Sequence, residues 1–335
     1  MALPHKPHHV AGGFRNPGEP AGPGLREFLR WQFERRRKVI PGPQSYHFPL
    51  AENDPPALRQ NRERTTLTWI GHATLFVQMA GLNILTDPQF SERASPLPWL
   101  GPRRVVLPGI PLEALPAIDV VVISHDHYDS LDRPTIHALH RRAGGARTRF
   151  FVPLGLGGWF RRLGIERVTE LDWWESAREG PLTLTAFPVR HWSKRGLLGR
   201  NRTLWAGWAV CSAGFRFLFL GDTGYTPRLR EVGERLGPFD LAAIPIGAYA
   251  PRWFMHHHHI DPEEAVQAML DLNARRAIAI HWGTFVLTDE PLDEPPRRLV
   301  KALRTRGLAP ETFRALRHGE TLFPDSSTPG AGGKG

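Results

Sequence analysis

The chain alternates short apolar runs with amphipathic segments, and the two patterns predict different elements. Apolar runs rich in β-branched residues and bounded by turn residues predict buried strands. Ala80-Gly81 separates the first two runs and predicts a hairpin. The predicted strands cover 66–78, 82–86, 119–124, 149–152, 182–189, 204–212, 215–220, 241–246 and 277–280.

Apolar residues at helical spacing predict helices between and around these strands. Asp132 and Asp261 stand where helix N-caps are expected, and Pro134 and Pro262 follow them within the first turn. Hairpins mixed with helical crossovers predict a mixed α/β fold, in which two sheets form a sandwich with helices outside. The predicted helices cover 25–40, 133–142, 227–236, 262–272 and 295–306.

The pattern divides the chain of 335 residues into three regions. Residues 1–60 form an arm rich in Pro, Gly and His that leads into a basic helix, and residues 61–322 form one large domain. The composition of residues 323–335 is typical of a disordered tail. The arm either wraps the body or stays mobile. The basic end of the helix, residues 35–38, is either solvated or contacts an anionic membrane or ligand.

Charge and cysteine content narrow the partners and the compartment. The formal net charge of +10 favours anionic partners, but the charge is spread and follows no RNA-binding motif, so no nucleic-acid partner is expected. The single cysteine, Cys211, excludes an intramolecular disulfide and a Cys-rich zinc site. Without a secretory signal or an apolar stretch of about 18 residues, we expect a cytoplasmic protein with no transmembrane span.

Three potential metal ligands leave the end of the predicted strand 119–124 at alternating positions. His125 and His127 are two residues apart in an extended loop, so their side chains point the same way and can chelate one ion, and Asp129 continues that register. Taken alone, the same string could be a hydrogen-bonded polar loop. Catalytic groups of open α/β sheets lie just beyond the carboxyl ends of strands, which favours a functional site.

Three further predicted strands end in residues that bind metals. His191, Asp222 and His281 are each the first strong ligand type after an apolar run. A single histidine in such a place is more often a structural residue, but four strand ends with the same property favour a hydrolytic zinc centre.

These residues lie in motifs that resemble the metallo-β-lactamase superfamily and, more narrowly, the family of N-acyl-phosphatidylethanolamine-hydrolysing phospholipases D. The similarity extends over roughly residues 60–320 and implies a four-layer αββα sandwich. The resembling stretches include TWIGHAT (68–74), LTDPQFSERASP (85–96), HDHYD (125–129), GDTG (221–224), GPFDLAAIPIGAYAPRWFM (237–255) and AIHWGT (279–284).

The resemblance implies a binuclear zinc centre with one altered position. The family motif has a histidine where this chain has Ser130, and a serine hydroxyl is a poor zinc ligand compared with imidazole. We therefore expect one firmly bound zinc and a second site of reduced affinity. The implied ligands are His125, His127 and His191 for the first ion, Asp222 as the bridge, and Asp129 and His281 for the second.

The resemblance also implies the reaction. In the family, water attacks the phosphodiester of a phospholipid whose ethanolamine nitrogen carries an acyl chain, releasing an N-acylethanolamine and leaving phosphatidic acid. Asp129 or Asp222 is the catalytic group expected to orient the water and accept its proton. Because the fold hosts many chemistries, two alternatives stay open: a hydrolase of a soluble phosphodiester, ester or lactone, and a metal-binding or lipid-binding protein of reduced turnover.

Other residues have a structural and a functional interpretation. The run 256–259 is expected to be a polar loop in which the resemblance singles out His259 as a substrate contact, and His72 is expected to be a structural strand histidine. Arg252 is either solvated or meets a phosphate, and Trp99 either packs on the body or enters the headgroup region of a membrane. A phospholipid substrate and peripheral contact with the inner face of the membrane are therefore expected, whereas the oligomeric state, including a homodimer, is left open.

Overall fold

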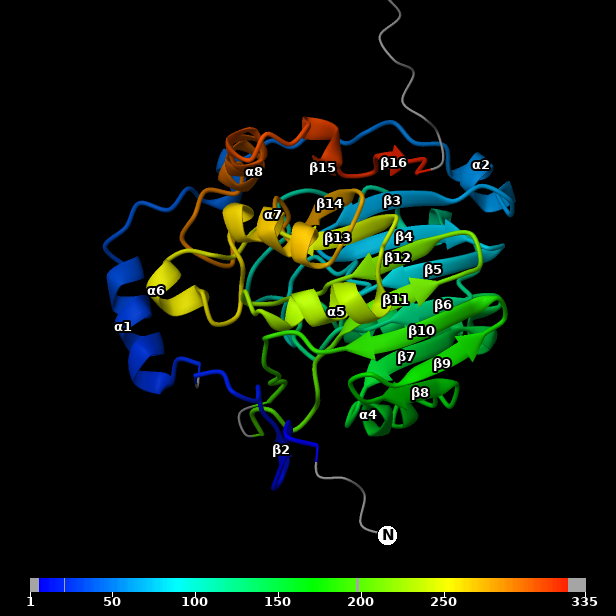
Figure 1. The fold of residues 1–335 in the computed structure, drawn as a ribbon, viewed down its shortest axis with the longest axis horizontal. Helices are drawn as coiled ribbons and strands as arrows, with labels where there is room; N and C mark the ends of the chain where they lie inside the picture. The colour runs from blue at the N-terminus through cyan, green and yellow to red at the C-terminus, as the bar shows by residue number, and fades with distance from the viewer. Residues whose placement is uncertain (1–5, 21, 197–198, 325–335) are drawn as a thin grey trace, which may run out of the picture.

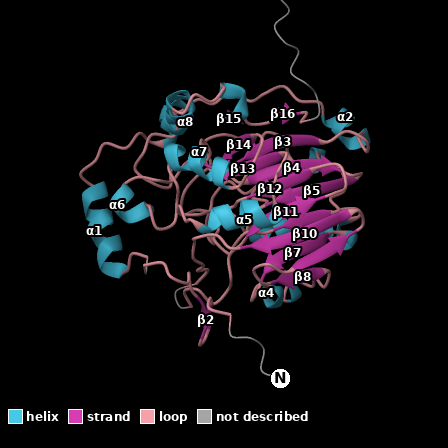
Figure 2. Cartoon of the chain, viewed as in Figure 1, coloured by secondary structure: helices cyan, strands magenta, loops and turns pink. Residues whose placement is uncertain are grey.

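Two seven-stranded sheets stacked face to face form the body of the molecule (Figures 1 and 2). The computed structural model describes residues 6–20, 22–196 and 199–324. One sheet has the order β15-β14-β13-β12-β11-β10-β9, made of β9 (Ser176–Glu179), β10 (Leu182–Phe187), β11 (Gly207–Cys211), β12 (Arg216–Phe219), β13 (Leu241–Pro245), β14 (Ala277–Ile280) and β15 (Phe313–Arg314). The other has the order β16-β3-β4-β5-β6-β7-β8, made of β3 (Thr66–Gly71), β4 (Thr74–Met79), β5 (Leu82–Thr86), β6 (Val120–Val122), β7 (Arg149–Pro153), β8 (Val168–Leu171) and β16 (Thr321–Leu322).

Helices cover the outer faces of this sandwich, and α1 and α6 stand together to one side of it (Figure 1). This arrangement confirms the predicted αββα sandwich. None of the helices in the described part of the chain is long and apolar enough to cross a bilayer. The α-helices are α1 (Leu25–Arg35), α2 (Pro55–Gln60), α3 (Arg133–Arg141), α4 (Gly157–Arg161), α5 (Arg228–Leu236), α6 (Arg252–Met255), α7 (Pro262–Asp271) and α8 (Glu294–Thr305).

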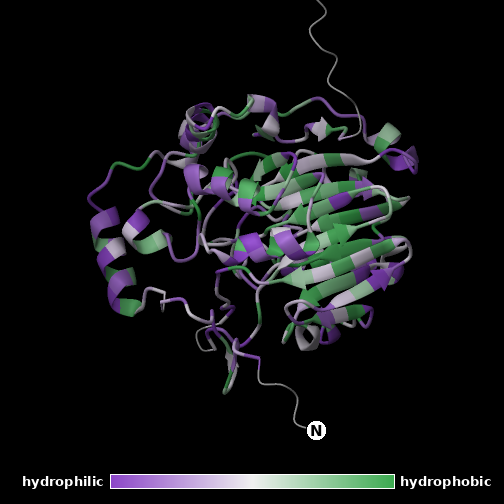
Figure 3. Ribbon diagram, viewed as in Figure 1, coloured by the Kyte–Doolittle hydropathy of each residue, from purple (hydrophilic) through white to green (hydrophobic). Residues whose placement is uncertain are grey.

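Alternate residues of the strands enter two separate cores. Leu75 and Val77 of β4 belong to the large cluster that extends through the layer between the sheets, whereas Phe76 belongs to a second cluster under α3 and α4. Figure 3 shows the strands as predominantly apolar, in contrast to the mixed colouring of the outer helices. Because both faces of the sheets are covered, the strands read as continuous apolar runs.

Several predicted boundaries of strands and helices differ from those in the structure. The run 66–78 is two antiparallel strands, β3 and β4, because the chain reverses at His72, whose φ of 53° places it in the left-handed region. The predicted Ala80-Gly81 hairpin is confirmed by the pairing of β4 with β5. The predicted helix 25–40 ends at Arg35, and the strand predicted from residue 204 begins at Gly207.

The described part of the N-terminal arm lies along the body. His9–Val10 (β1) and Gly13–Phe14 (β2) form a small antiparallel pair. Asn16 ties this segment to the candidate site, since its Nδ2 donates to the carbonyl of His191 over 2.8 Å. The predicted disordered tail lies, from residue 325 onward, outside the described residues.

Candidate metal centre

The residues predicted to form a metal site come together from both sheets. His125, His127 and Asp129 lie in the loop after β6, while His191, Asp222 and His281 follow β10, β12 and β14 in the other sheet. Strand β12 runs parallel to β13 and β13 to β14, so these carboxyl ends meet at one edge. The six side chains are therefore placed by the ends of four different strands.

Three histidine rings turn one nitrogen each toward a common point. His127 Nδ1 lies 2.8 Å from His125 Nε2 and 3.3 Å from His191 Nε2. Three ring nitrogens this close, with His125 and His191 fully buried, are the arrangement of a site that accepts one cation. Asp222 Oδ2 lies 3.7 Å from the same nitrogen of His125.

The outer ring nitrogens of His125 and His191 are held by neighbours that fix the tautomer, whereas His127 Nε2 has no hydrogen-bond partner among the described residues. His191 Nδ1 donates to the carbonyl of His258 over 3.0 Å, since a carbonyl can only accept. His125 Nδ1 lies 2.8 Å from Ser124 Oγ, which in turn donates to Asp87 Oδ2. Both Nε2 atoms therefore direct a lone pair inward, as metal-bound histidines do when a second hydrogen bond orients them.

Asp222 joins this set to a second one. Its Oδ2 lies 3.1 Å from His281 Nε2, and that nitrogen is 3.5 Å from Asp129 Oδ2. Asp129 Oδ2 also lies 3.1 Å from His72 Nε2. Asp222 Oδ1 is buried and, among the described residues, has no hydrogen-bond donor. An unpaired buried carboxylate oxygen is costly unless a cation completes it, so these residues fit a binuclear metal centre.

The protonation states also suit metal binding. Burial lowers the pKa of His125 to about 3, so its imidazole is neutral at neutral pH. Burial opposes ionisation of Asp129 and Asp222, but hydrogen bonds and charge from the neighbouring histidines hold the pKa of both carboxyl groups well below their usual range. Burial lowers the pKa of His281 as well, yet Asp222 and Asp129 raise it to about 10. The rise reflects two carboxylates beside one imidazole, a negative environment that a bound cation would compensate.

The remaining predicted residues lie at different distances from this centre. His259 lines the cavity beside it, with its ring centroid 5.3 Å from that of His281. Arg252 does not line that cavity, because its guanidinium pairs with Glu264 at 2.7 Å. Trp99 does not line it either and is 69% exposed in its loop. Ser130 is fully buried, and its hydroxyl has no hydrogen-bond partner among the described residues.

A cavity of about 500 Å³ opens from the metal-binding residues toward α1. Its inner end holds His127, Asp129 and Asp222, and its rim carries the cationic side chains of Lys194 and Arg200. The outer wall is apolar and consists of Leu25, Phe28 and Trp31 of α1 together with Phe254 and Met255 of α6. The site thus combines a polar floor, two cations and an apolar wall.

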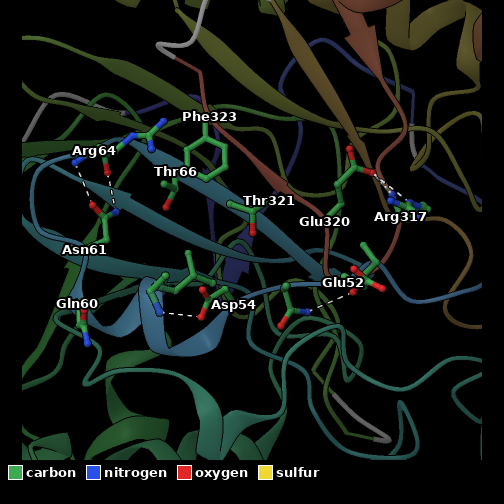
Figure 4. A pocket seen from close by; sticks show the side chains of 14 residues that line it. Glu52, Asp54, Gln60, Asn61, Arg64, Thr66, Arg317, Glu320, Thr321 and Phe323 are labelled. Atoms are coloured by element: carbon green, nitrogen blue, oxygen red, sulfur yellow. Dashed lines mark hydrogen bonds and ion pairs between the residues drawn. The ribbon is translucent and has the colours of Figure 1, made fainter.

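A second cavity of about 750 Å³ lies away from the histidines (Figure 4). Its polar groups bond to their own neighbours: Asn61 Nδ2 donates to the carbonyl of Arg64 over 2.8 Å, and Asp54 caps α2. Glu320 likewise accepts from the backbone of Arg317 at 3.0 Å. Since none of the metal-binding candidates lines this cavity, the chemistry belongs to the first cavity.

Three kinds of site residue were missed in the sequence. His72 was expected in a strand but lies in the turn between β3 and β4, where it faces Asp129. Asp87 follows β5 and anchors the Ser124 backbone at 2.7 Å, a role that only the three-dimensional contact reveals. The apolar wall comes from α1, whose sequence signal was its basic end rather than its apolar face. A histidine next to a glycine at a strand end, as in Gly71-His72, is the one signal that was available.

Comparison with known proteins agrees with this architecture. The model of the beta-lactamase superfamily domain matches residues 82–282. An N-acyl-phosphatidylethanolamine-hydrolyzing phospholipase D of Caenorhabditis elegans is 44% identical over 250 residues, which span 71% of this chain and 70% of the worm protein. A protein of the same name from Saccharomyces cerevisiae is 36% identical over 239 residues, 69% of this chain and 50% of the yeast protein.

A solved structure of a metallo hydrolase from the archaeon Ignicoccus hospitalis shares the fold, with a TM-score of 0.59 and 22% identity over 78% of this chain and 98% of that one. The family model, over residues 82–282, includes the six predicted metal ligands from His125 to His281. The chain therefore belongs to the beta-lactamase superfamily, within the family of the N-acyl-phosphatidylethanolamine-hydrolysing phospholipases D, and is a metal-dependent hydrolase.

Proposed function

We propose that this protein is a phosphodiesterase of the phospholipase D type. Its substrates would be N-acyl-phosphatidylethanolamine-like lipids, which it cleaves to an N-acylethanolamine and phosphatidic acid. The observation that carries the proposal is the cavity in which Asp129 and Asp222 form the floor and Leu25 and Phe28 form part of the wall. A polar floor suits the phosphodiester, and an apolar wall suits acyl chains.

The residues present fit two zinc ions. His125, His127 and His191 would hold one ion, Asp129 and His281 the other, and Asp222 both. Two divalent ions bound there would make a water nucleophilic at neutral pH and neutralise charge on the phosphoryl oxygens. The serine at position 130 supplies no imidazole, so the second ion is expected to be the weaker one.

The chain's own groups would bind and orient the substrate. Asp129 and Asp222 are ionised and lie at the cavity floor, so either can hold the attacking water by a hydrogen bond and accept its proton. Lys194 and Arg200 line the same cavity and can pair with the phosphate. His259 is half-buried next to His281 and can contact the headgroup. Water then protonates the outgoing alkoxide of the N-acylethanolamine.

The outer side of α1 supports access from a lipid surface. Leu25, Leu29 and Phe33 of this helix are 73%, 57% and 56% exposed, although they are large apolar residues. Arg26 and Arg30 lie on the same helix and can pair with anionic headgroups. An amphipathic basic helix at the mouth of the cavity is typical of proteins that bind membranes peripherally.

The decisive experiment offers two substrates to the zinc-loaded protein. We expect N-acyl-phosphatidylethanolamine in mixed micelles to be hydrolysed faster than a soluble bis-aryl phosphodiester, with phosphatidic acid detected as a product by mass spectrometry. Preference for the soluble phosphodiester or for a lactone would overturn the lipid assignment and favour a soluble substrate. Zinc binding without turnover of any of these substrates would indicate a metal-binding protein that has lost catalysis.

A further inference from the structure

The second metal set lacks a histidine at position 130 but contains one from elsewhere in the chain. Without it, Asp129, Asp222 and His281 would give the second ion three protein ligands, of which only one is an imidazole. Ser130 does not supply an imidazole: its hydroxyl is buried without a hydrogen-bond partner among the described residues, and a neutral hydroxyl is a poor ligand for zinc. A second imidazole for this ion would therefore come from another loop.

His72 lies where such a donor is needed. Its Nε2 is 3.1 Å from Asp129 Oδ2, and its ring centroid is 4.1 Å from that of His281. The donor atoms of these three residues all lie within 4.8 Å of one another. The side chain is 1% exposed, so no solvent competes for the imidazole nitrogen.

The backbone holds His72 in this position at a cost. Its φ of 53° is in the left-handed region, as is the φ of 61° at His281. For a residue with a side chain this conformation is strained, and such strain collects at functional sites. Two hydrogen bonds fix the strained turn: His72 N donates to Thr284 Oγ1 over 2.8 Å, and His281 N donates to the His72 carbonyl over 3.0 Å. The two histidines are thus locked to each other through their main chains.

His259 is the other histidine near this set, and its placement differs. Its donor atom groups with those of Asp222 and His281, whereas it is absent from the group around Asp129. His259 also lines the substrate cavity, which His72 does not. The two imidazoles therefore approach from different sides, with His259 toward the substrate and His72 toward Asp129.

We infer that His72 is a ligand of the second metal ion and supplies, from the β3–β4 turn, the imidazole that Ser130 lacks. The second ion would then have four protein donors: His72, Asp129, Asp222 and His281. This inference rests on the binuclear centre of the proposed function. It does not depend on the identity of the substrate.

Metal content tests the inference without reference to activity. The full-length protein, its variants His72→Ala and His72→Gln, and the comparison variant His259→Ala are each loaded with cobalt(II) and freed of excess metal. We expect two equivalents of cobalt in the parent and in His259→Ala, and one equivalent in both His72 variants. The visible absorption of the cobalt ion should fall in step with its stoichiometry.

The variant His72→Gln separates a ligand from a hydrogen-bond donor. Its side-chain amide can still donate to the Asp129 carboxylate, but an amide is a poor ligand for zinc or cobalt compared with imidazole. Retention of two equivalents in His72→Gln or His72→Ala would overturn the inference, and so would a single equivalent in the parent. Circular dichroism checks that each variant is folded.

A rescue variant completes the test. His72→Ala combined with Ser130→His returns an imidazole to the second set by the route that the family motif uses, and we expect it to restore the second equivalent. If the metal contents are as expected but the protein does not hydrolyse the lipid, the proposed substrate is wrong and the assignment of His72 as a ligand stands. Loss of the second equivalent in His259→Ala but not in the His72 variants would assign the ligand to His259 and refute the inference.

Discussion

Replacing Gly221 by alanine should disturb the metal centre without touching a metal-binding side chain. Gly221 precedes Asp222 and has a φ of 63°. A Cβ at this position would lie 2.6 Å from Ser124 Cβ, whereas non-bonded carbon atoms prefer about 3.5–4.0 Å. Ser124 cannot easily retreat, because its N–H donates to Asp87 over 2.7 Å and its hydroxyl contacts His125.

The expected loss follows from two costs. The left-handed conformation costs a non-glycine residue roughly 1–2 kcal/mol, and forcing an extra methyl group into a packed interior costs about 1–3 kcal/mol. Together they predict that Gly221→Ala lowers the free energy of unfolding by about 2–5 kcal/mol. The overlap would also push the His125 loop away from Asp222, and a displacement near 1 Å can cost about 100-fold in turnover.

Urea unfolding of the metal-free protein measures the first effect, and zinc affinity in competition with a chromogenic chelator measures the second. Gly214→Ala is the matched control, since no atom lies within 4 Å of its added Cβ. That variant should change the unfolding free energy by less than about 1 kcal/mol. If Gly221→Ala were as stable as Gly214→Ala and bound zinc as tightly as the parent, the reasoning from this contact would be refuted.

Three further predictions concern charge and metal. Asp222→Asn should lower turnover by more than about 100-fold and release metal, because the bridging charge beside His281 is lost. Atomic absorption measures the metal content, and lipid hydrolysis measures the turnover. Retained metal with normal turnover would contradict this prediction. Burial raises the pKa of Asp172, but hydrogen bonds from His8 and Lys6 outweigh this effect and hold the pKa below its usual range. The ionised carboxylate therefore stabilises the fold fully above the pKa of an unfolded Asp, about 3.9. This stabilisation is lost as the pH falls through the lower pKa of the folded protein. Asp172→Asn should therefore cost about 2 kcal/mol at neutral pH and progressively less in acid, in urea titrations at several pH values; a loss that did not shrink in acid would count against the pairing. Removing metal with a chelator should lower the melting temperature in differential scanning calorimetry, and an unchanged melting temperature would mean that the metal contributes nothing to the fold.

The parts of the fold that could be predicted are those set by continuous apolar runs. The segments 241–245 and 277–280 are buried on both faces, so composition alone marks them as strands. Ser176–Glu179 (β9) was missed because it is an edge strand with alternating exposed positions and no large apolar residue. The chain reversal at His72 was missed because a left-handed turn residue other than glycine gives no pattern.

Site residues that directly follow a predicted strand could be predicted from the sequence. Site residues that reach the centre from another part of the fold could not. His125, His191 and His281 could be found because each follows the carboxyl end of an apolar strand, and these ends of both sheets meet in space. The position of His72 beside Asp129 requires the β3–β4 turn to fold back against the end of β14, and no local pattern contains that contact. The ion pair of Arg252 could not be predicted, because its partner Glu264 lies on the next helix along the chain.

The two sheets share the metal centre, and this couples metal binding to the packing of the sandwich. His125 and Asp129 project from the sheet that contains β6, whereas Asp222 and His281 project from the sheet that contains β14. Ions held between them would bridge the two sheets. For each such ion, the free energy of unfolding would rise by about 4 kcal/mol when the free metal concentration is about a thousand times the dissociation constant. If His72 also binds, the β3–β4 turn joins this bridge, because β3 and β4 belong to the β6 sheet. The bond to the metal would then add to the two hydrogen bonds that hold its left-handed backbone, so loss of the second ion should loosen this turn before the rest of the sheet.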